Sequence, residues 1–205
     1  MAERDYLKEV YDLDTVDATR RFYDDWSESY DSEIARQGYA TPARCAAALA
    51  EFATDKTAPT LDFGCGTGLS GMALAGAGFT TIDGVDLSPE MLERAKGRGV
   101  YRALALADPE AGAPFAPGAY AHVAAIGVIG SGAAPAETID AILGALGPGG
   151  LFVFSFNDHT LDDPVFEGRV MEYVDCGAAE LLFREHGDHL PGIGLSATVY
   201  VLRKR

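Results

Sequence analysis

The feature that most constrains the fold is a regular alternation of short apolar runs with segments of helical pattern, which begins at Thr60. Five apolar runs of strand length follow in order, at residues 60–63, 80–85, 101–106, 120–126 and 151–156. Because strands that alternate with helices pair in parallel, this order predicts a doubly wound, Rossmann-like α/β sheet. Two further runs, 180–185 and 196–202, are joined by a loop at 187–194 and predict an antiparallel hairpin at one edge. We therefore expect a mostly parallel, seven-stranded sheet.

The N-terminal quarter of the chain has helical periodicity instead. Four side chains recur every four residues, which places them on one helix face: Phe22, Trp26, Tyr30 and Ile34. Thr41 followed by Pro42 predicts a helix N-cap with proline in the first turn, and the second helix then ends near Phe52. We expect a single domain over residues 1–205, with a helical cap at 1–54 and a core at 55–205.

A glycine-rich turn, GCGTG at residues 64–68, follows the first strand and opens the next helix. Glycines allow the backbone to turn sharply and to touch a ligand, and the N-terminus of the following helix offers free N–H groups. Leu69 occupies the position where the dinucleotide fingerprint has its third glycine, which argues against a pyrophosphate loop. Asp86 ends the second strand, where a carboxylate can accept both ribose hydroxyls of a nucleoside. Loop and acid together predict a nucleoside site.

These residues resemble the motifs of class I S-adenosylmethionine-dependent methyltransferases. The stretch DFGCGTG at 62–68 matches the first motif of that family, and GVDLSPEML at 84–92 matches the second. The turn GPGGL at 147–151 and the stretch at 23–31 are also typical. The chain is most similar to the Williams–Beuren-region methyltransferase-like subfamily, through GF at 78–79, DGVD at 83–86 and RGVY at 98–101. The resemblance covers nearly the whole chain and implies S-adenosylmethionine as the cofactor of a methyl-transfer enzyme.

The resemblance also implies where the cofactor binds. The glycine loop would line its methionine and ribose parts, and Asp86 would bind the ribose hydroxyls. Asp108 would accept from the adenine amino group, and Asp62 would fix the loop, while Tyr23 or Tyr30 would close over the methionine end. The full set of implied cofactor-binding residues is Tyr23, Tyr30, Asp62, Gly64, Cys65, Gly66, Thr67, Gly68, Asp86, Leu87, Ser88, Met91, Ala107, Asp108, Ile126 and Gly127.

The sequence assigns no catalytic residue, because the sulfonium of the cofactor already carries the activated methyl group. His159, just after the fifth strand, is the candidate for a general base, although an exposed loop histidine is the favoured interpretation. His122 lies in a predicted strand and suits a core role. His186 and His189 flank the residues of the hairpin loop without a third ligand at metal spacing, so no metal site is expected, and both are interpreted as surface residues that border the pocket. Ala121 stands where the family often has an acid.

Charge and composition bear on partners and compartment. Asp and Glu number 31 against 16 Lys and Arg, for a net charge of −15. Because such a field repels polyanions, we expect a small-molecule acceptor, and neither a nucleic acid nor a membrane as partner. Three scattered cysteines and an N-terminus without an apolar run indicate a cytoplasmic protein. No pattern indicates the oligomeric state.

The leading hypothesis is therefore methyl transfer from S-adenosylmethionine to a small molecule by in-line displacement. One alternative is a sensor or scaffold that binds S-adenosylmethionine without turnover, which the lack of an obvious base allows. Another is a nicotinamide-dependent oxidoreductase, against which Leu69 argues.

Overall fold

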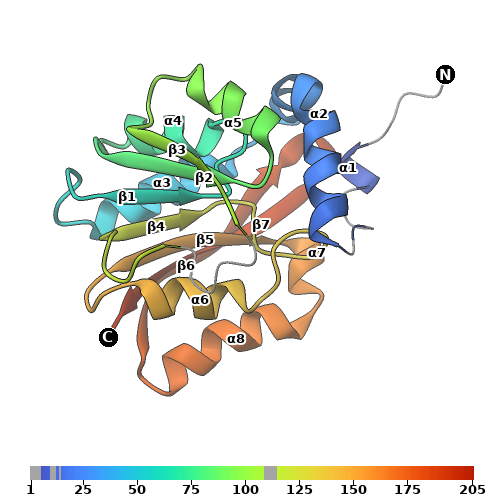
Figure 1. The fold of residues 1–205 in the computed structure, drawn as a ribbon. Helices are drawn as coiled ribbons and strands as arrows, with labels where there is room; N and C mark the ends of the chain where they lie inside the picture. The colour runs from blue at the N-terminus through green and yellow to red at the C-terminus, as the bar shows by residue number, and fades with distance from the viewer. Residues whose placement is uncertain (1–5, 10–12, 14, 109–114) are drawn as a thin grey trace.

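The computed structural model describes residues 6–9, 13, 15–108 and 115–205. One seven-stranded sheet lies between layers of helices (Figure 1). The strands are β1 (Thr60–Phe63), β2 (Ile82–Asp86), β3 (Ala103–Leu106), β4 (His122–Ala125), β5 (Leu151–Asn157), β6 (Ala179–Leu190) and β7 (Leu195–Lys204). The helices are α1 (Tyr6–Glu9), α2 (Val16–Arg36), α3 (Thr41–Phe52), α4 (Leu69–Gly76), α5 (Pro89–Lys96), α6 (Thr138–Ala145), α7 (Asp158–Leu161) and α8 (Pro164–Asp175).

The strand order is β3-β2-β1-β4-β5-β7-β6. β1 pairs in parallel with both β2 and β4, so the chain winds toward one edge and then returns to wind toward the other. β7 pairs antiparallel with β5 and with β6. The predicted sheet, mostly parallel with an antiparallel C-terminal pair, is confirmed. Because the winding direction reverses between β1 and β4, the loops at their carboxyl ends separate and leave a crevice.

The C-terminal hairpin is longer than the sequence predicted. β6 runs on to Leu190, so much of the segment predicted as a loop is paired strand, and the connection is the short 3-10 turn η2 (Pro191–Ile193). Gly187 lies opposite Ala197, and Asp188 lies opposite Ser196. Strand pairing uses backbone groups, so the glycine and polar residues that indicated a loop remain in the ladder of this edge strand.

Alternation along the central strands divides the core into two layers. Val123 and Ala125 belong to the cluster packed with α6 and α8, whereas Ala124 and Ile126 belong to the cluster packed with α3 and α4. Successive side chains of a strand point to opposite faces, so a strand that is covered on both sides is apolar throughout. This double coverage explains why β4 and β5 read as continuous apolar runs in the sequence.

Two helix starts show how local and distant groups compete for a side chain. At α5 the Ser88 hydroxyl accepts from the Met91 N–H at 3.1 Å and Pro89 follows in the first turn, as the sequence predicted. At α3 the prediction that Thr41 is the N-cap is wrong, because the helix begins at Thr41 and Ala40 is its cap residue. The Thr41 hydroxyl lies 2.7 Å from Nδ1 of His189 instead, so a tertiary contact replaces the expected cap.

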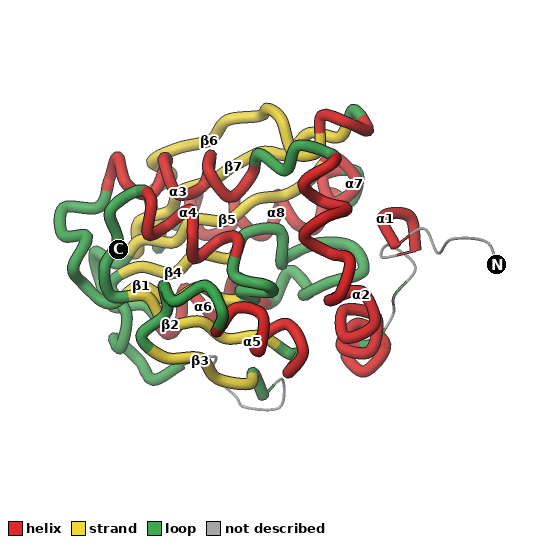
Figure 2. Tube along the Cα trace, turned by 90° about the horizontal axis from the view of Figure 1, so that it is seen from above, coloured by secondary structure: helices red, strands yellow, loops and turns green. Residues whose placement is uncertain are grey.

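The two long N-terminal helices take different positions. α3 packs against the sheet beside α4, through the buried Cys45 and Leu49. α2 lies at the carboxyl ends of the parallel strands (Figure 2), where Phe22, Trp26 and Ile34 are buried as their spacing predicted. Within the described ranges, no helix has both the length and the apolar character needed to cross a bilayer.

Candidate functional site

A cavity of about 1000 Å³ lies at the carboxyl ends of the parallel strands. Its walls come from the glycine loop after β1, the ends of β2 and β3, the segment after β4 and the inner face of α2. This position includes the point where the winding direction of the sheet reverses, which is the general binding site of open α/β folds. The cavity is therefore the first candidate for a ligand site.

The three glycines of the loop have different surroundings, although all take positive φ values. A Cβ on Gly64 would lie 2.4 Å from Cγ2 of Val128, so that position is closed by packing. Gly68 is the residue that caps the start of α4, and a Cβ on it would lie 2.8 Å from Cγ of Arg98. A Cβ on Gly66, where φ is +53°, would meet no atom within 4 Å, because that side of the backbone is open space. Gly66 is thus the position at which the loop backbone itself can touch a ligand.

Asp86 occupies the end of β2, opposite the glycine loop. Its Oδ2 accepts from the Gly66 N–H at 2.8 Å, and its Oδ1 accepts from the Ser88 N–H at 3.0 Å. Each carboxylate oxygen has two lone pairs, so each retains one acceptor site for a ligand. Burial raises the pKa of Asp86, an effect that the N–H bonds oppose. The two N–H groups therefore hold the carboxylate in a wall of the cavity. Each of its oxygens keeps one lone pair that can accept a hydrogen bond from a ligand.

Asp62 lies behind the loop and does not line the cavity. Its side chain is fully buried, and its Oδ2 accepts from the hydroxyls of Ser70 at 2.6 Å and Tyr101 at 2.7 Å. Its Oδ1 has no hydrogen-bond partner among the described residues, and burial raises the pKa of this carboxyl to about 6. The bond to Ser70 ties the end of β1 to α4, which is the loop-fixing geometry expected of this residue.

The predicted cofactor-binding residues are gathered in one place. All of them except Asp62 and Gly68 line the large cavity, although they come from α2, β1, β2, β3 and β4 and the segments that follow these elements. Leu87, Met91 and Ala107 form one end of the cavity, where the Ala107 N–H donates to the carbonyl of Asp86 at 2.8 Å. His159 lies apart from them, exposed on the short helix α7 and outside the lining of this cavity.

Three contacts tie α2 to the loops beneath it, and sequence reasoning did not identify them. Asp24 accepts from the Ser88 hydroxyl. Asp31 accepts from the Thr67 hydroxyl at 2.5 Å and pairs with the guanidinium of Arg98. The signal in the sequence was the seven-residue spacing of the two aspartates, which places them on the same face of a helix. We call this set the α2 latch.

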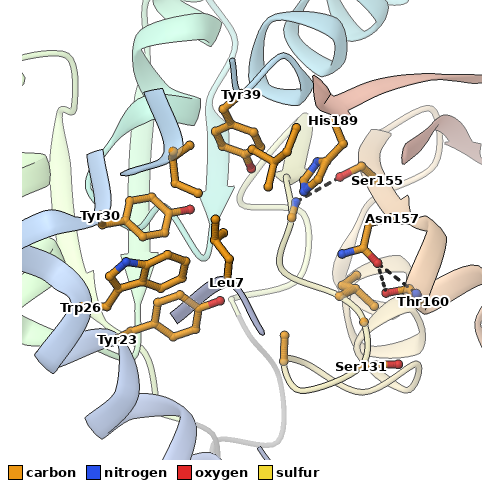
Figure 3. A pocket seen from close by; sticks show the side chains of 16 residues that line it. Leu7, Tyr23, Trp26, Tyr30, Tyr39, Ser131, Ser155, Asn157, Thr160 and His189 are labelled. Carbon is orange, nitrogen blue, oxygen red and sulfur yellow. Dashed lines mark hydrogen bonds between the residues drawn. The ribbon is translucent and has the colours of Figure 1, made fainter. Parts of the chain in front are cut away.

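A second, smaller pocket of about 80 Å³ adjoins the large cavity, with which it shares Tyr23, Tyr30, Tyr39, Gly127 and Ala133. Figure 3 shows aromatic side chains of α2 on one side of it and Ser155, Asn157, Thr160 and His189 on the other. The sequence predicted His189 as a surface residue at the border of the pocket, whereas the structure buries it in the wall; Ser155 and Thr160 were not assigned to a pocket.

Gly127 stands where the two cavities meet. Its φ is +69°, and a Cβ there would lie 2.8 Å from the hydroxyl oxygen of Tyr39. Its N–H donates to the Ser155 hydroxyl at 3.1 Å, which fixes the end of β4 against β5. Gly127 therefore lets Tyr39 lie close to the end of β4, and a larger residue at this position would push Tyr39 away.

The remaining histidines have structural surroundings. His122 is buried in β4, donates through Nε2 to the Asp55 carbonyl at 3.0 Å and contacts the ring of Phe79, which confirms the core role predicted for it. His186 is exposed and bonds Asp158 at 2.9 Å. Across the part of the chain that the structure describes, no group of three or more His, Cys, Asp and Glu side chains is arranged to hold a metal ion.

Comparisons with known proteins agree with this geometry. A family described as "Methyltransferase domain" matches residues 36–193. Human methyltransferase-like protein 27 is 35% identical over 133 residues, which are 63% of this chain and 54% of that protein. The bovine 18S rRNA (guanine-N(7))-methyltransferase is 44% identical over 66 residues, which are 32% of this chain and 23% of that protein. The chain thus spans about half, or less, of the length of the curated relatives that it matches.

Solved structures share the fold. A chain from the complex between the Haloferax volcanii Trm112 methyltransferase activator and a methyltransferase superposes with a TM-score of 0.67, at 19% identity, over 91% of this chain and 98% of that one. A methyltransferase from Thiobacillus denitrificans, solved with S-adenosyl-L-homocysteine, superposes with a TM-score of 0.56, at 15% identity, over 79% of this chain and 91% of that one. At these identities the likeness establishes the fold.

The comparisons correct one prediction. The expectation that a nucleic acid is excluded as a partner is wrong, since the relatives include 18S rRNA methyltransferases, and a similar structure solved with an activator protein points to protein partners as well. Net charge sums over the whole surface, whereas docking depends on local groups and on any protein that assembles with the enzyme. A charge of −15 therefore does not decide the class of acceptor.

The match to the family extends from the last residue of α2 to the end of η2 and includes both motifs. The strand order, the glycine loop and the carboxylate opposite it agree with that match. The chain belongs to the methyltransferase domain family and is a class I S-adenosylmethionine-dependent methyltransferase by fold and motif.

Proposed function

We propose that this chain binds S-adenosylmethionine in the large cavity and transfers its methyl group to a small-molecule acceptor. The observation that carries the proposal is the facing pair of Gly66 and Asp86. The open side of Gly66 offers a surface for the ligand, and the Asp86 carboxylate keeps one acceptor on each oxygen. Two adjacent acceptors suit the two hydroxyls of a ribose ring.

The other residues fit an adenosyl ligand on either side of that pair. Leu87, Met91 and Ala107 supply an apolar end for a base, and Asp108 lines the same end with a carboxylate. Tyr23 and Tyr30 line the cavity from α2, where an aromatic face favours a positively charged sulfonium. S-adenosylmethionine supplies an activated methyl group, whose bond to sulfur breaks as the lone pair of the acceptor attacks.

The small pocket supports the acceptor half of the proposal. It adjoins the end of the large cavity that Tyr23 and Tyr30 line, so an acceptor there would face the methyl group. Its volume of about 80 Å³ marks a small site that opens beside the large cavity and suits one planar ring. The protein's contribution to rate would be alignment of the two reactants and exclusion of water.

An RNA acceptor is the second candidate, and the rRNA methyltransferases among the relatives favour it. The small pocket would then take one base removed from its stack, as enzymes that modify bases require. Because the chain covers less than a quarter of the length of that bovine relative, its acceptor is carried over only as this candidate.

Calorimetry with S-adenosylmethionine and S-adenosylhomocysteine tests the cofactor half, with NADH as the competing ligand. We expect both adenosyl compounds to bind and NADH to give no heat. Absence of binding by both at millimolar concentration would refute the proposal. Release of S-adenosylhomocysteine in the presence of small phenols, amines and thiols, or of ribosomal RNA, then separates the two acceptor classes. Binding without turnover on any acceptor would favour a non-catalytic sensor.

A further inference from the structure

The small pocket differs from the rest of the molecule in its charge. Its sixteen lining residues include no Asp, Glu, Lys or Arg among the described part of the chain, whereas 23% of the whole sequence is charged. Tyr30 and Tyr39 line it as neutral phenols, because burial raises the pKa of each above its ordinary value. The pocket is therefore enclosed by aromatic, aliphatic and neutral polar groups.

His189 is the one histidine in this lining, and it is also uncharged at neutral pH. Burial lowers the pKa of its imidazole to about 4, while nearby Asp158 opposes the shift and Arg44 adds to it. Nδ1 is engaged with the Thr41 hydroxyl at 2.7 Å, and the ring meets Tyr39 edge to face. The contact to Thr41 leaves Nε2 as the ring nitrogen that can serve a ligand.

Asn157 has a defined orientation on the same wall. Its Oδ1 accepts from the Thr160 N–H at 2.9 Å and from the Thr160 hydroxyl at 3.0 Å. Because a backbone N–H can only donate, the oxygen of the amide must face Thr160, and Figure 3 shows the amide nitrogen directed into the pocket. His189 and Asn157 thus present neutral hydrogen-bonding groups opposite the aromatic side chains of α2.

We infer that the methyl acceptor of this enzyme is an uncharged molecule with a planar apolar body, held between the aromatic side chains of α2 and the polar groups of His189 and Asn157. This inference rests on the proposed function and names the substrate class of that site. His189 and Asn157 become specificity-determining residues that select acceptors by hydrogen bonding and by the absence of charge.

The physical reason is desolvation. A buried charge without a partner loses its hydration, and the described residues of the lining supply no opposite charge to replace it. A cationic acceptor would in addition face the sulfonium of the cofactor. A neutral group with hydrogen-bonding capacity loses little, because Nε2 of His189 can replace the water that it leaves.

Three matched probes test the inference on protein saturated with S-adenosylhomocysteine. The probes are p-cresol, 4-hydroxybenzoate and 4-hydroxybenzylamine, which carry the same phenol and differ in the charge of the para group at pH 7.5. We expect ligand-detected NMR to give an affinity for p-cresol at least tenfold higher than for either charged probe. Equal affinities for the three probes, or tighter binding of a charged one, would overturn the inference.

Asn157→Asp makes the test sharper, because it adds one negative charge and keeps a side-chain oxygen that can cap α7. We expect this variant to prefer 4-hydroxybenzylamine to p-cresol by about tenfold. Thr54→Asp is the matched control, since it adds the same charge at an exposed position before β1, at the opposite end of the parallel strands. An unchanged preference in Asn157→Asp, with the fold intact by circular dichroism, would also overturn the inference.

His189→Phe keeps a ring of similar shape and removes both nitrogens. We expect this variant to lower the affinity for p-cresol at least fivefold while leaving the affinity for S-adenosylhomocysteine within twofold of the wild-type value. Equal p-cresol affinity in this variant would remove His189 from the acceptor site. Failure of the wild-type protein to bind S-adenosylhomocysteine would instead refute the proposed function, so the two failures are distinguishable.

Discussion

The two sides of the cleft are built in different ways. The side proposed for the cofactor uses backbone N–H groups and carboxylates from short stretches of chain, such as the loop at 64–68 and Asp86 at the end of β2. The side proposed for the acceptor is uncharged and assembled from distant elements, with Trp26 on α2, Asn157 after β5 and His189 on β6.

The two constructions suit two kinds of ligand: a cofactor that all enzymes of the family share, and an acceptor that differs from one enzyme to another. A ligand that is the same for every enzyme of the family can be held by backbone atoms, which do not depend on side-chain identity. An acceptor that differs between enzymes has to be recognised by side chains, which can change one at a time. If this division holds, a substitution on one side should change the binding of one ligand more than that of the other.

The largest effect is expected from Gly66→Val. A Cβ at residue 66 meets no protein atom within 4 Å, so a larger side chain would occupy the space proposed for the ligand. We expect calorimetry to detect no binding of S-adenosylhomocysteine. Gly99→Val is the matched control, because Gly99 also has a positive φ with open space and lies outside both cavities. Wild-type affinity in Gly66→Val would break the assignment of backbone contact to this side.

The next effect concerns the pH dependence of stability through Asp62. Burial raises the pKa of this carboxyl to about 6 in the folded state, so the folded protein holds the proton more tightly than the unfolded chain does. The stability that this proton supplies is complete below about pH 4 and is lost as pH rises through 6, with an amplitude of about 3 kcal/mol. We expect denaturant titrations of Asp62→Asn to lack this loss.

Asp83→Asn is the control for that measurement, because the environment of Asp83 acts in the opposite direction. Arg102 holds the pKa of Asp83 below its ordinary value, so the stability from this pair is lost as pH falls. The two variants should therefore shift the pH profile in opposite senses. Parallel profiles for wild type and Asp62→Asn would show that folding does not raise the pKa of Asp62.

Asp86→Ala is expected to weaken ligand binding without abolishing it. The variant loses two hydrogen bonds between ribose hydroxyls and a charged acceptor, each worth about 1.5–3 kcal/mol. We expect the affinity for S-adenosylhomocysteine to fall at least tenfold in calorimetry, while p-cresol binding, which belongs to the other side of the cleft, changes less. Unchanged adenosyl affinity would contradict the ribose assignment.

The smallest effect is expected from Asp31→Ala, which opens the α2 latch that joins the two sides. The carboxylate is partly exposed, and partly exposed ion pairs contribute about 1 kcal/mol or less. We expect a loss of about threefold in adenosyl affinity, from a less firmly held α2. Glu28→Ala, an exposed position on the same helix, should change nothing measurable. Equal effects in the two variants would show that the latch does not support the site.

Much of the fold and of the cofactor side could be predicted because the signals there are local. The glycine turn needs positive φ values that only glycine adopts readily, and the Ser88 cap acts within one helical turn. The side-chain contacts of the acceptor side could not be predicted. Thr41 reads as a cap and His189 reads as a loop residue until the packing of α3 against β6 brings them within 2.7 Å of each other.

The prediction of a loop at 187–194 and the exclusion of nucleic acids as partners were wrong for related reasons. The polar residues of β6 gave a loop-like pattern although their backbone pairs with β7, and pairing leaves no trace in side-chain type on an edge strand. The net charge of −15 described an average over a surface, whereas the pocket proposed for the acceptor has a lining without a charged side chain among the described residues.

By itself, the sequence determined the sheet, its winding and the cradle for an adenosyl group, because each depends on periodicity or on residues a few positions apart. Only the tertiary structure decided which side chains face one another across the acceptor pocket and hold α2 over the cofactor. Those contacts join residues that are far apart along the chain, and their energies arise only after the strands have paired and the helices have packed.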